Sequence, residues 1–228
     1  MKLFICKKSL IIILAVIIAV GATLGICAGV VSASTHTDGT TIVIDAGHGG
    51  IDGGVMGVAT STKESDINLS ISKYLRGFFS NAGFNTILTR SDQGGLYGVS
   101  SKGFKMRDMK KRKEIIENCN ADMVISVHQN FCPIPSRRGG QVFYDKNSEC
   151  GKLLAQSIQT SLNKMEQCVK QNSPLVGDYF MLKCTTNPSV IVECGFLSNK
   201  DDEALLVSAE YQKAIAYAIF KGAVAYYS

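Results

Sequence analysis

Thr41-Ile-Val-Ile-Asp45 is a run of mostly β-branched residues that leads into a glycine-rich loop containing His48. Two other apolar runs have the same form and also lead into a side chain suited to chemistry: Asp122-Met-Val-Ile-Ser-Val127 before His128, and Val190-Ile-Val192 before Glu193. Runs of this kind predict buried strands. In open α/β sheets, ligands bind beyond the carboxyl ends of the strands. The sequence therefore predicts that two histidines and a glutamate gather at one edge of a sheet.

Segments with helical spacing lie between the predicted strands. In residues 61–80, for example, Ile67, Ile71 and Leu75 recur on one helical face. The expected helices are residues 61–80, 106–118, 148–165, 203–207 and 209–226, and the expected strands are 41–44, 85–89, 122–127, 140–144, 180–183 and 190–192. Strands that alternate with helices predict an α/β fold, a single domain with a mostly parallel central sheet and helices on both faces.

Residues 1–33 have the composition of a targeting segment. Three lysines precede an uncharged apolar run over residues 9–31, and small residues follow it. This order is typical of a secretory signal peptide, and the run is also long enough to span a bilayer. The sequence therefore predicts export beyond the cytoplasmic membrane, with residues 1–33 as a signal peptide or an N-terminal membrane anchor. Residues 34–40 are then a linker, residues 41–228 the catalytic domain, and any membrane contact would involve residues 9–31.

The charge of the chain gives no reason to expect a nucleic-acid partner. The net charge of +5 falls to about +2 once the three leader lysines are set aside. The basic stretch over residues 102–113 is interpreted as a solvated helix face, with docking onto an anionic polymer as the alternative.

Eight cysteines occur, six of them in the body of the chain, and none forms a C-x-x-C pair. This spacing argues against a cysteine zinc site. Because most of the six lie in apolar surroundings, free structural thiols are expected. Export would also permit a disulfide. Cys194 is the only cysteine near the proposed site and so the only candidate thiol nucleophile.

His48 and Glu64 each have more than one interpretation. The glycines around His48 allow close approach to a ligand. Their spacing argues against a phosphate-binding loop, because Asp52 replaces the last glycine of the G-x-G-x-x-G motif. An ordinary loop histidine is the other alternative. Ser61-Thr-Lys-Glu64 fits a capping box, yet Glu64 also lies on the buried face of the expected helix. A carboxylate buried there requires a partner, and a metal ion would be one.

His48, Glu64 and His128 together form a His₂Glu set that leaves the fourth position of a zinc ion for water. Zinc suits imidazole ligands better than magnesium does. Glu193 could then accept a proton from that water and pass it to a leaving amine. The alternatives are structural roles, a core histidine at His128 and a buried carboxyl at Glu193. Asp45 either orients a ligand histidine or is a turn residue at the strand end.

With these residues the chain resembles the zinc-dependent N-acetylmuramoyl-L-alanine amidases of the amidase 3 family. The resemblance covers about residues 41–227, through Ile44-Asp-Ala-Gly-His-Gly-Gly50, Glu64-Ser-Asp-Ile-Asn-Leu69, Leu88-Thr-Arg90, Ser126-Val-His-Gln-Asn130 and Val192-Glu-Cys-Gly-Phe-Leu-Ser-Asn199. It implies zinc ligands at His48, Glu64 and His128 and a catalytic role for Glu193. It also implies peptidoglycan as substrate, cleaved between the muramic acid lactyl group and L-alanine.

The chain departs from the family pattern only at non-ligand positions, Ala46, Ser65 and Cys194. Residues 129–139 form a short loop, where division amidases of this family carry an inhibitory helical insertion. The resemblance therefore implies a site that is not blocked in cis. No second wall-binding domain follows the catalytic body, so targeting is expected to depend on the leader or on an activating or targeting protein partner.

This architecture, a leader followed by a single catalytic domain, is similar to that of the spore-cortex, or germination-specific, subgroup of these amidases. Gly177-Asp-Tyr-Phe-Met-Leu182 and Glu193-Cys-Gly-Phe196 carry this part of the resemblance. It implies a role in cortex maturation, where removal of the peptide prepares muramic δ-lactam, and a location in the cell wall or the forespore intermembrane space. A vegetative cell-wall amidase, a zinc peptidase acting on the stem peptide and an inactive wall-binding module are the alternatives.

Overall fold

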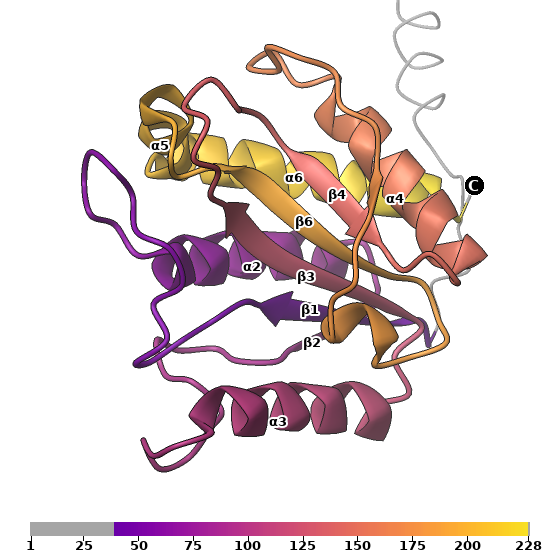
Figure 1. The fold of residues 1–228 in the computed structure, drawn as a ribbon. Coiled ribbons are helices and arrows are strands. Elements are labelled where there is room, and N and C mark those ends of the chain that lie inside the picture. The colour runs from indigo at the N-terminus through magenta and orange to yellow at the C-terminus, as the bar shows by residue number, and fades with distance from the viewer. Residues whose placement is uncertain (1–38, 228) are drawn as a thin grey trace, which may run out of the picture. The chain divides into compact units, whose positions relative to one another are not determined.

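The computed structural model describes residues 39–227 of the chain (Figure 1). At its centre is a six-stranded sheet in the order β2-β1-β3-β6-β4-β5. The strands are β1 Thr41–Ala46, β2 Asn85–Leu88, β3 Met123–Asn130, β4 Gln141–Tyr144, β5 Leu175–Val176 and β6 Ser189–Phe196. Neighbouring strands are parallel except β4 and β6, which pair antiparallel.

Helices cover both faces of this sheet (Figure 1). The helices are α2 Glu64–Asn81, α3 Phe104–Asn118, α4 Glu149–Leu162, α5 Lys200–Leu206 and α6 Ala209–Ala225, with a 3₁₀ turn η1 at Met181–Lys183. Ile42 and Ile44 of β1 pack into the core beneath α2, α4 and α6, whereas Val43 packs with Ile116 of α3 on the opposite face. The predicted single α/β domain with a mostly parallel sheet is confirmed.

The segment between α4 and β6 differs from the prediction. The strand expected over residues 180–183 is wrong, because Met181–Lys183 forms η1 and the strand of this segment is β5, Leu175–Val176. Met181 and Leu182 are adjacent and both buried, whereas a strand turns adjacent side chains to opposite faces. Residues 180–183 contain only three consecutive apolar residues, too few for their periodicity to distinguish these conformations.

The start of α5 also differs from the prediction, which placed it at residue 203. The side chain of Asn199 accepts hydrogen bonds from the backbone N–H groups of Asp201 and Asp202, so the helix begins at Lys200. An asparagine N-cap satisfies backbone donors that the first helical turn leaves unpaired.

The six cysteines of the described chain are free thiols, which agrees with the expectation of structural thiols. Cys194 is fully buried, and burial raises the pKa of its thiol above the ordinary value. A thiol with a raised pKa is mostly protonated and is therefore a poor nucleophile.

The signal peptide or anchor predicted for residues 1–33 lies outside the described residues. Among residues 39–227, none of the helices combines the length and the apolar character needed to cross a bilayer.

Candidate active site

The four candidate residues come from four separate elements that meet at one edge of the sheet. His128 and Glu193 lie near the carboxyl ends of β3 and β6 and are register partners in the parallel ladder. His48 lies in the loop that follows β1, and Glu64 is the first residue of α2. The structure therefore brings together the four residues that the sequence singled out.

Glu64 lies between the two histidines. Its Oε1 is 2.9 Å from Nδ1 of His128, and its Oε2 is 3.3 Å from Nε2 of His48. The side chain is only 2% exposed. Although burial acts in the opposite direction, contacts with His128 and His48 hold the pKa of Glu64 well below its usual range. Glu64 is therefore a carboxylate at neutral pH, as a metal ligand must be.

The capping-box interpretation of Glu64 is wrong. Helix α2 has Lys63 at its N-cap and no side-chain cap, and the Glu64 backbone N–H donates to the Val55 carbonyl. Backbone N–H groups of Val55 and Gln129 instead donate to the Glu64 carboxylate, as does Nδ2 of Asn68. These donors orient the carboxylate toward the two histidines.

Two glycines lie where these side chains leave no room for a Cβ atom. A Cβ at Gly47 would come within 2.3 Å of the His128 ring, and one at Gly54 within 2.4 Å of Glu64 Oε2. Real Cβ atoms do not approach other atoms so closely, so these positions allow backbone and side chain to meet. The glycine-rich sequence is thus explained in part by the space that the candidate ligands occupy.

The backbone of the loop that carries His48 is held by two buried arginines. His48 itself has φ +60°, in the left-handed region that is costly for a residue with a side chain. Arg112 of α3 donates to the carbonyls of Ala46 and His48, at 2.8 and 2.6 Å. Arg90, after β2, donates to the carbonyls of Ala46 and Gly47, at 2.8 and 2.9 Å. These contacts hold the loop in its strained conformation.

Arg112 also corrects the interpretation of residues 102–113 as a solvated face. Its side chain is only 1% exposed and forms ion pairs with Asp45 and Asp108, both at 2.6 Å. A run of basic residues shows that a helix has charges but not which of them are buried. No local pattern around Arg112 indicates this role, whereas Arg90 lies within one of the motifs that carry the family resemblance.

Asp45 neither orients a histidine nor lies in a turn. The structure shows no hydrogen bond between it and His48 or His128, and it lies within β1. Its carboxylate accepts from Arg112, Thr89 and Ser126. Burial alone would raise the pKa of Asp45, but Arg112 and the two hydroxyls outweigh it and lower the pKa to about 2. Asp45 is therefore one partner of a buried ion pair beneath the His48 loop.

Loss of this carboxylate charge is expected to destabilise the fold in acid. Because the pKa of Asp45 is lower in the folded than in the unfolded chain, its contribution is present above about pH 4 and disappears as the pH falls toward 2. The shift corresponds to roughly 2 kcal/mol. Urea unfolding from pH 6 to pH 2.5 should show the stability difference between wild type and Asp45→Asn shrinking; a constant difference would contradict this assignment.

Asp52 contacts His48 on the side away from Glu64. Its Oδ2 is 3.1 Å from His48 Nδ1, and its Oδ1 is 3.4 Å from Nζ of Lys105. A carboxylate at one ring nitrogen holds the proton there and leaves the other nitrogen free to bind a metal. His48 Nε2, which faces Glu64, is therefore the ring nitrogen that is available to bind a metal. The residues around Asp52 in the sequence do not indicate this role.

Glu193 has the opposite environment to Glu64. Its Oε2 is buried and has no hydrogen-bond partner in the described structure. Burial, the largest effect, and the nearby charge of Glu64 raise the pKa of Glu193 to about 7. The two histidines act in the opposite direction but are outweighed. A carboxyl that titrates near neutrality can both accept and donate a proton.

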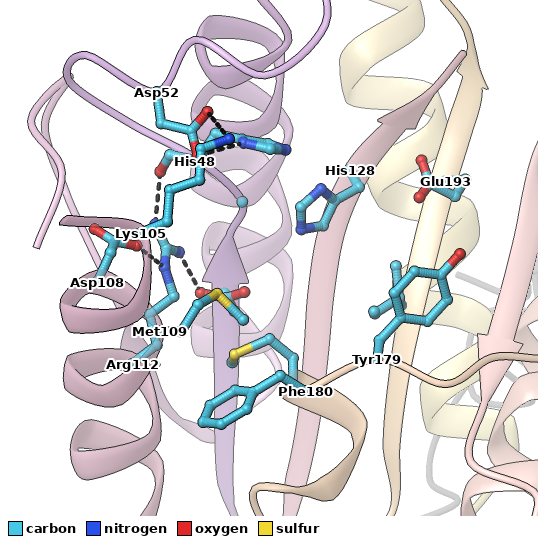
Figure 2. Close-up of a pocket in the computed structure, with 14 residues that line it drawn as sticks. His48, Asp52, Lys105, Asp108, Met109, Arg112, His128, Tyr179, Phe180 and Glu193 are labelled. Atoms are coloured by element: carbon cyan, nitrogen blue, oxygen red, sulfur yellow. Dashed lines mark hydrogen bonds and ion pairs between the residues drawn. The ribbon is translucent and has the colours of Figure 1, made fainter. Parts of the chain in front are cut away.

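A cavity of about 250 Å³ opens beside these residues (Figure 2). His48, His128 and Glu193 line it, together with Lys105 on one side and Tyr179 on the other. Substrate could therefore reach the candidate residues directly. Between β3 and β4 the described chain forms no helix that would cover the cavity.

The histidines and Glu64 fit a shared metal ion. Their candidate ligand atoms all lie within 4.8 Å of one another. In a tetrahedral zinc site with bonds of about 2.0–2.1 Å, ligand atoms are roughly 3.3 Å apart, and the two histidine–carboxylate distances here are 2.9 and 3.3 Å. Two histidines and one carboxylate beside a carboxyl of raised pKa are typical of zinc hydrolases.

Comparison with known proteins identifies the family within this class. The chain belongs to the Amidase_3 family of N-acetylmuramoyl-L-alanine amidases, which matches over residues 42–225, and it is an enzyme of this kind that acts on peptidoglycan. It is 30% identical to the germination-specific N-acetylmuramoyl-L-alanine amidase of Bacillus subtilis over 86% of this chain and 83% of that protein.

Solved structures of related amidases share the fold. The CwlD amidase from Clostridioides difficile, in complex with the GerS lipoprotein, superposes with a TM-score of 0.79 at 39% identity, covering 82% of this chain and 98% of that chain. The amidase AmiC2 of Nostoc punctiforme gives a TM-score of 0.71 at 29% identity, over 82% and 97% of the two chains.

Proposed function

We propose that the chain hydrolyses the amide between N-acetylmuramic acid and L-alanine with a zinc ion held by His48, Glu64 and His128. The observation that carries this proposal is the buried, unpartnered Oε2 of Glu193 beside the His/Glu/His set. Buried polar atoms in proteins nearly always have a partner. A carboxyl oxygen without one, at the wall of an open cavity, is available for a proton from substrate or water.

The two glutamates have different roles because their environments differ. Glu64 remains ionised and binds the metal, while Glu193, with its pKa near 7, accepts a proton at Oε2 and then donates it to the departing alanine nitrogen. Zinc, when bound, supplies a water of lowered pKa and polarises the carbonyl. Asp52 keeps His48 in the correct tautomer, and Arg90 and Arg112 hold its backbone.

The products of peptidoglycan digestion test this function. The full chain, loaded with zinc, is incubated with purified peptidoglycan, and new end groups are identified. Free alanine amines without new reducing sugars support the amidase, and cleavage only within the stem peptide would favour the zinc peptidase instead. A chelated sample serves as the control; full activity after verified removal of the metal would contradict the zinc proposal.

The biological setting we propose is the spore cortex, with vegetative cell wall as the alternative. The named relative from Bacillus subtilis is germination-specific, which supports this setting. Because peptidoglycan lies outside the cytoplasmic membrane, the proposal includes export, as a secreted or membrane-anchored protein. Cortex peptidoglycan and vegetative peptidoglycan digested side by side distinguish the two, since faster release from vegetative material would oppose a cortex role.

We also propose a protein partner, because CwlD was solved with the GerS lipoprotein. A purified chain that binds zinc stoichiometrically and reaches full turnover alone would argue against such a requirement.

Replacing Gly47 with alanine is expected to weaken zinc binding. The added Cβ would lie 2.3 Å from the His128 ring, so the ring must leave its present position beside Glu64. Displacing a ligand by this indirect route is expected to reduce metal affinity by about 10- to 100-fold, as removal of supporting contacts does. Competition with a chromophoric chelator measures the affinity directly.

Gly53→Ala in the same loop is the matched control, because its Cβ would make only an ordinary contact of 3.4 Å with Lys63. Equal zinc affinity in the two variants would show that the close approach of Gly47 to His128 does not matter.

A further inference from the structure

The cavity at the active site has two walls of different chemistry. On one side lies Tyr179, which is 40% exposed. On the other side lie Lys105 and Asp52, and His128 lies between the two walls in Figure 2. A substrate that spans the cavity therefore meets the Tyr179 ring at one end and a charged pair at the other.

The ammonium group of Lys105 is available to a ligand. Its side chain is 67% exposed, and its contact with Asp52 is long, at 3.4 Å. An ammonium has three donors, so this single contact leaves donors unused. Arg112, the other cationic side chain among the described lining residues, is buried and bound to Asp45, Asp108 and backbone carbonyls. Lys105 is thus the cation that an incoming substrate can reach.

Lys105 also lies at a suitable place relative to the metal ligands. Asp52 links it to His48: one carboxylate oxygen of Asp52 is 3.4 Å from Nζ of Lys105, and the other is 3.1 Å from Nδ1 of His48. Consecutive Cα atoms in a peptide are about 3.8 Å apart, so a group one residue beyond the cleaved amide lies roughly 6–8 Å from it. Lys105 lines the same cavity as His48 and is therefore placed to meet a group next to the cleaved amide.

We propose that Lys105 is a specificity-determining residue that binds a carboxylate on the stem peptide, one residue beyond the L-alanine. The proposal rests on the amidase function proposed above. The aromatic wall then receives the sugar: Tyr179 packs edge-on against Phe143, with ring centroids 5.5 Å apart, and presents its exposed face to the apolar face of a sugar ring. Because the two walls differ, they fix the direction in which the glycan–peptide lies across the cavity.

Two matched substrates test the role of Lys105. Both are short glycan strands bearing the same muramoyl-L-alanyl peptide, and they differ only in whether the second residue carries a free carboxylate or the corresponding carboxamide. Zinc-loaded wild type should cleave the carboxylate form about two- to fivefold more efficiently, as expected for a largely exposed charge pair. This preference should decline as ionic strength rises.

Lys105→Gln should remove the preference by raising KM for the carboxylate form, and Lys105→Glu should reverse it. Lys105→Arg should retain it. Lys110→Gln is the control, because Lys110 is an exposed residue of the same helix that does not line the cavity. Zinc affinity is measured for each variant, because a role that acts only through Asp52 and His48 would change metal binding rather than substrate preference.

Each outcome of this experiment decides a separate point. Equal cleavage of both substrates by wild type, or an unchanged preference in Lys105→Gln, would overturn the role of Lys105 while leaving the amidase function in place. A Lys105→Gln variant that loses zinc and slows equally on both substrates would also overturn it. Failure of zinc-loaded wild type to release the peptide from either strand, and from whole peptidoglycan, would contradict the amidase function itself.

Discussion

Glu193→Gln is expected to bind zinc as the wild type does and to lose most of its turnover. The amide has the size of the carboxyl but cannot accept the proton that Oε2 would accept. Loss of a positioned proton-transfer group costs about 10²–10⁴-fold in rate. His48, Glu64 and His128 are untouched, so metal content should stay near one ion per chain. The measurements are the rate of amine release from peptidoglycan and the bound metal by elemental analysis.

Two comparisons make this result specific. Glu166→Gln, at an exposed glutamate away from the cavity, should leave both quantities unchanged. His128→Ala should lose the zinc as well as the activity, because it removes one of three ligands. If Glu193→Gln kept a near-normal rate, proton transfer would have to be assigned to another group.

Arg112→Met is expected to lower the free energy of unfolding by about 3–5 kcal/mol. Methionine can occupy much of the volume of the arginine side chain but leaves Asp45 as a buried charge without its cation. It also removes the Arg112 hydrogen bond to the His48 carbonyl and one of the two arginine hydrogen bonds to the Ala46 carbonyl, which Arg90 still contacts. This loss is large compared with the 5–15 kcal/mol that stabilises a typical domain.

Chemical denaturation of wild type and variant measures the loss. Arg76→Met is the control, because Arg76 is an exposed residue of α2 and its replacement should change stability by no more than about 0.5 kcal/mol. The stability of Arg112→Lys should lie between those of Arg112→Met and Arg76→Met, because lysine keeps the positive charge but lacks the planar guanidinium that donates several hydrogen bonds at once. If Arg112→Met were as stable as the control, the ion pair with Asp45 would contribute little.

The fold and the central residues of the site could be predicted because their patterns are local. The β-branched run over residues 41–44 and the apolar runs before His128 and Glu193 identify buried strands, and parallel strands end at one edge of the sheet. The position of Glu64 on the apolar face of α2 indicated that it is buried. Its local sequence also fitted a capping box, and only the structure shows that its donors are Val55, Asn68 and Gln129.

The residues that support the site could not be predicted because their partners are distant in the chain. Arg112 lies among lysines that are exposed, and nothing in its local sequence shows that this side chain faces β1. Its ion pair with Asp45 joins residues 67 positions apart. Lys105 and Tyr179 likewise reach the same cavity only through the arrangement of α3 and the segment after β5.

The two arginines beneath the His48 loop have a consequence for how the enzyme matures. Because hydrogen bonds from Arg90 and Arg112 hold the loop, we expect it to keep its shape whether or not an ion is bound. Folding and metal acquisition can then be separate events, unlike in zinc fingers, which remain unfolded until they are loaded. Under the export and the zinc site proposed above, such a polypeptide could leave the cell without its ion and acquire one afterwards from the surrounding medium.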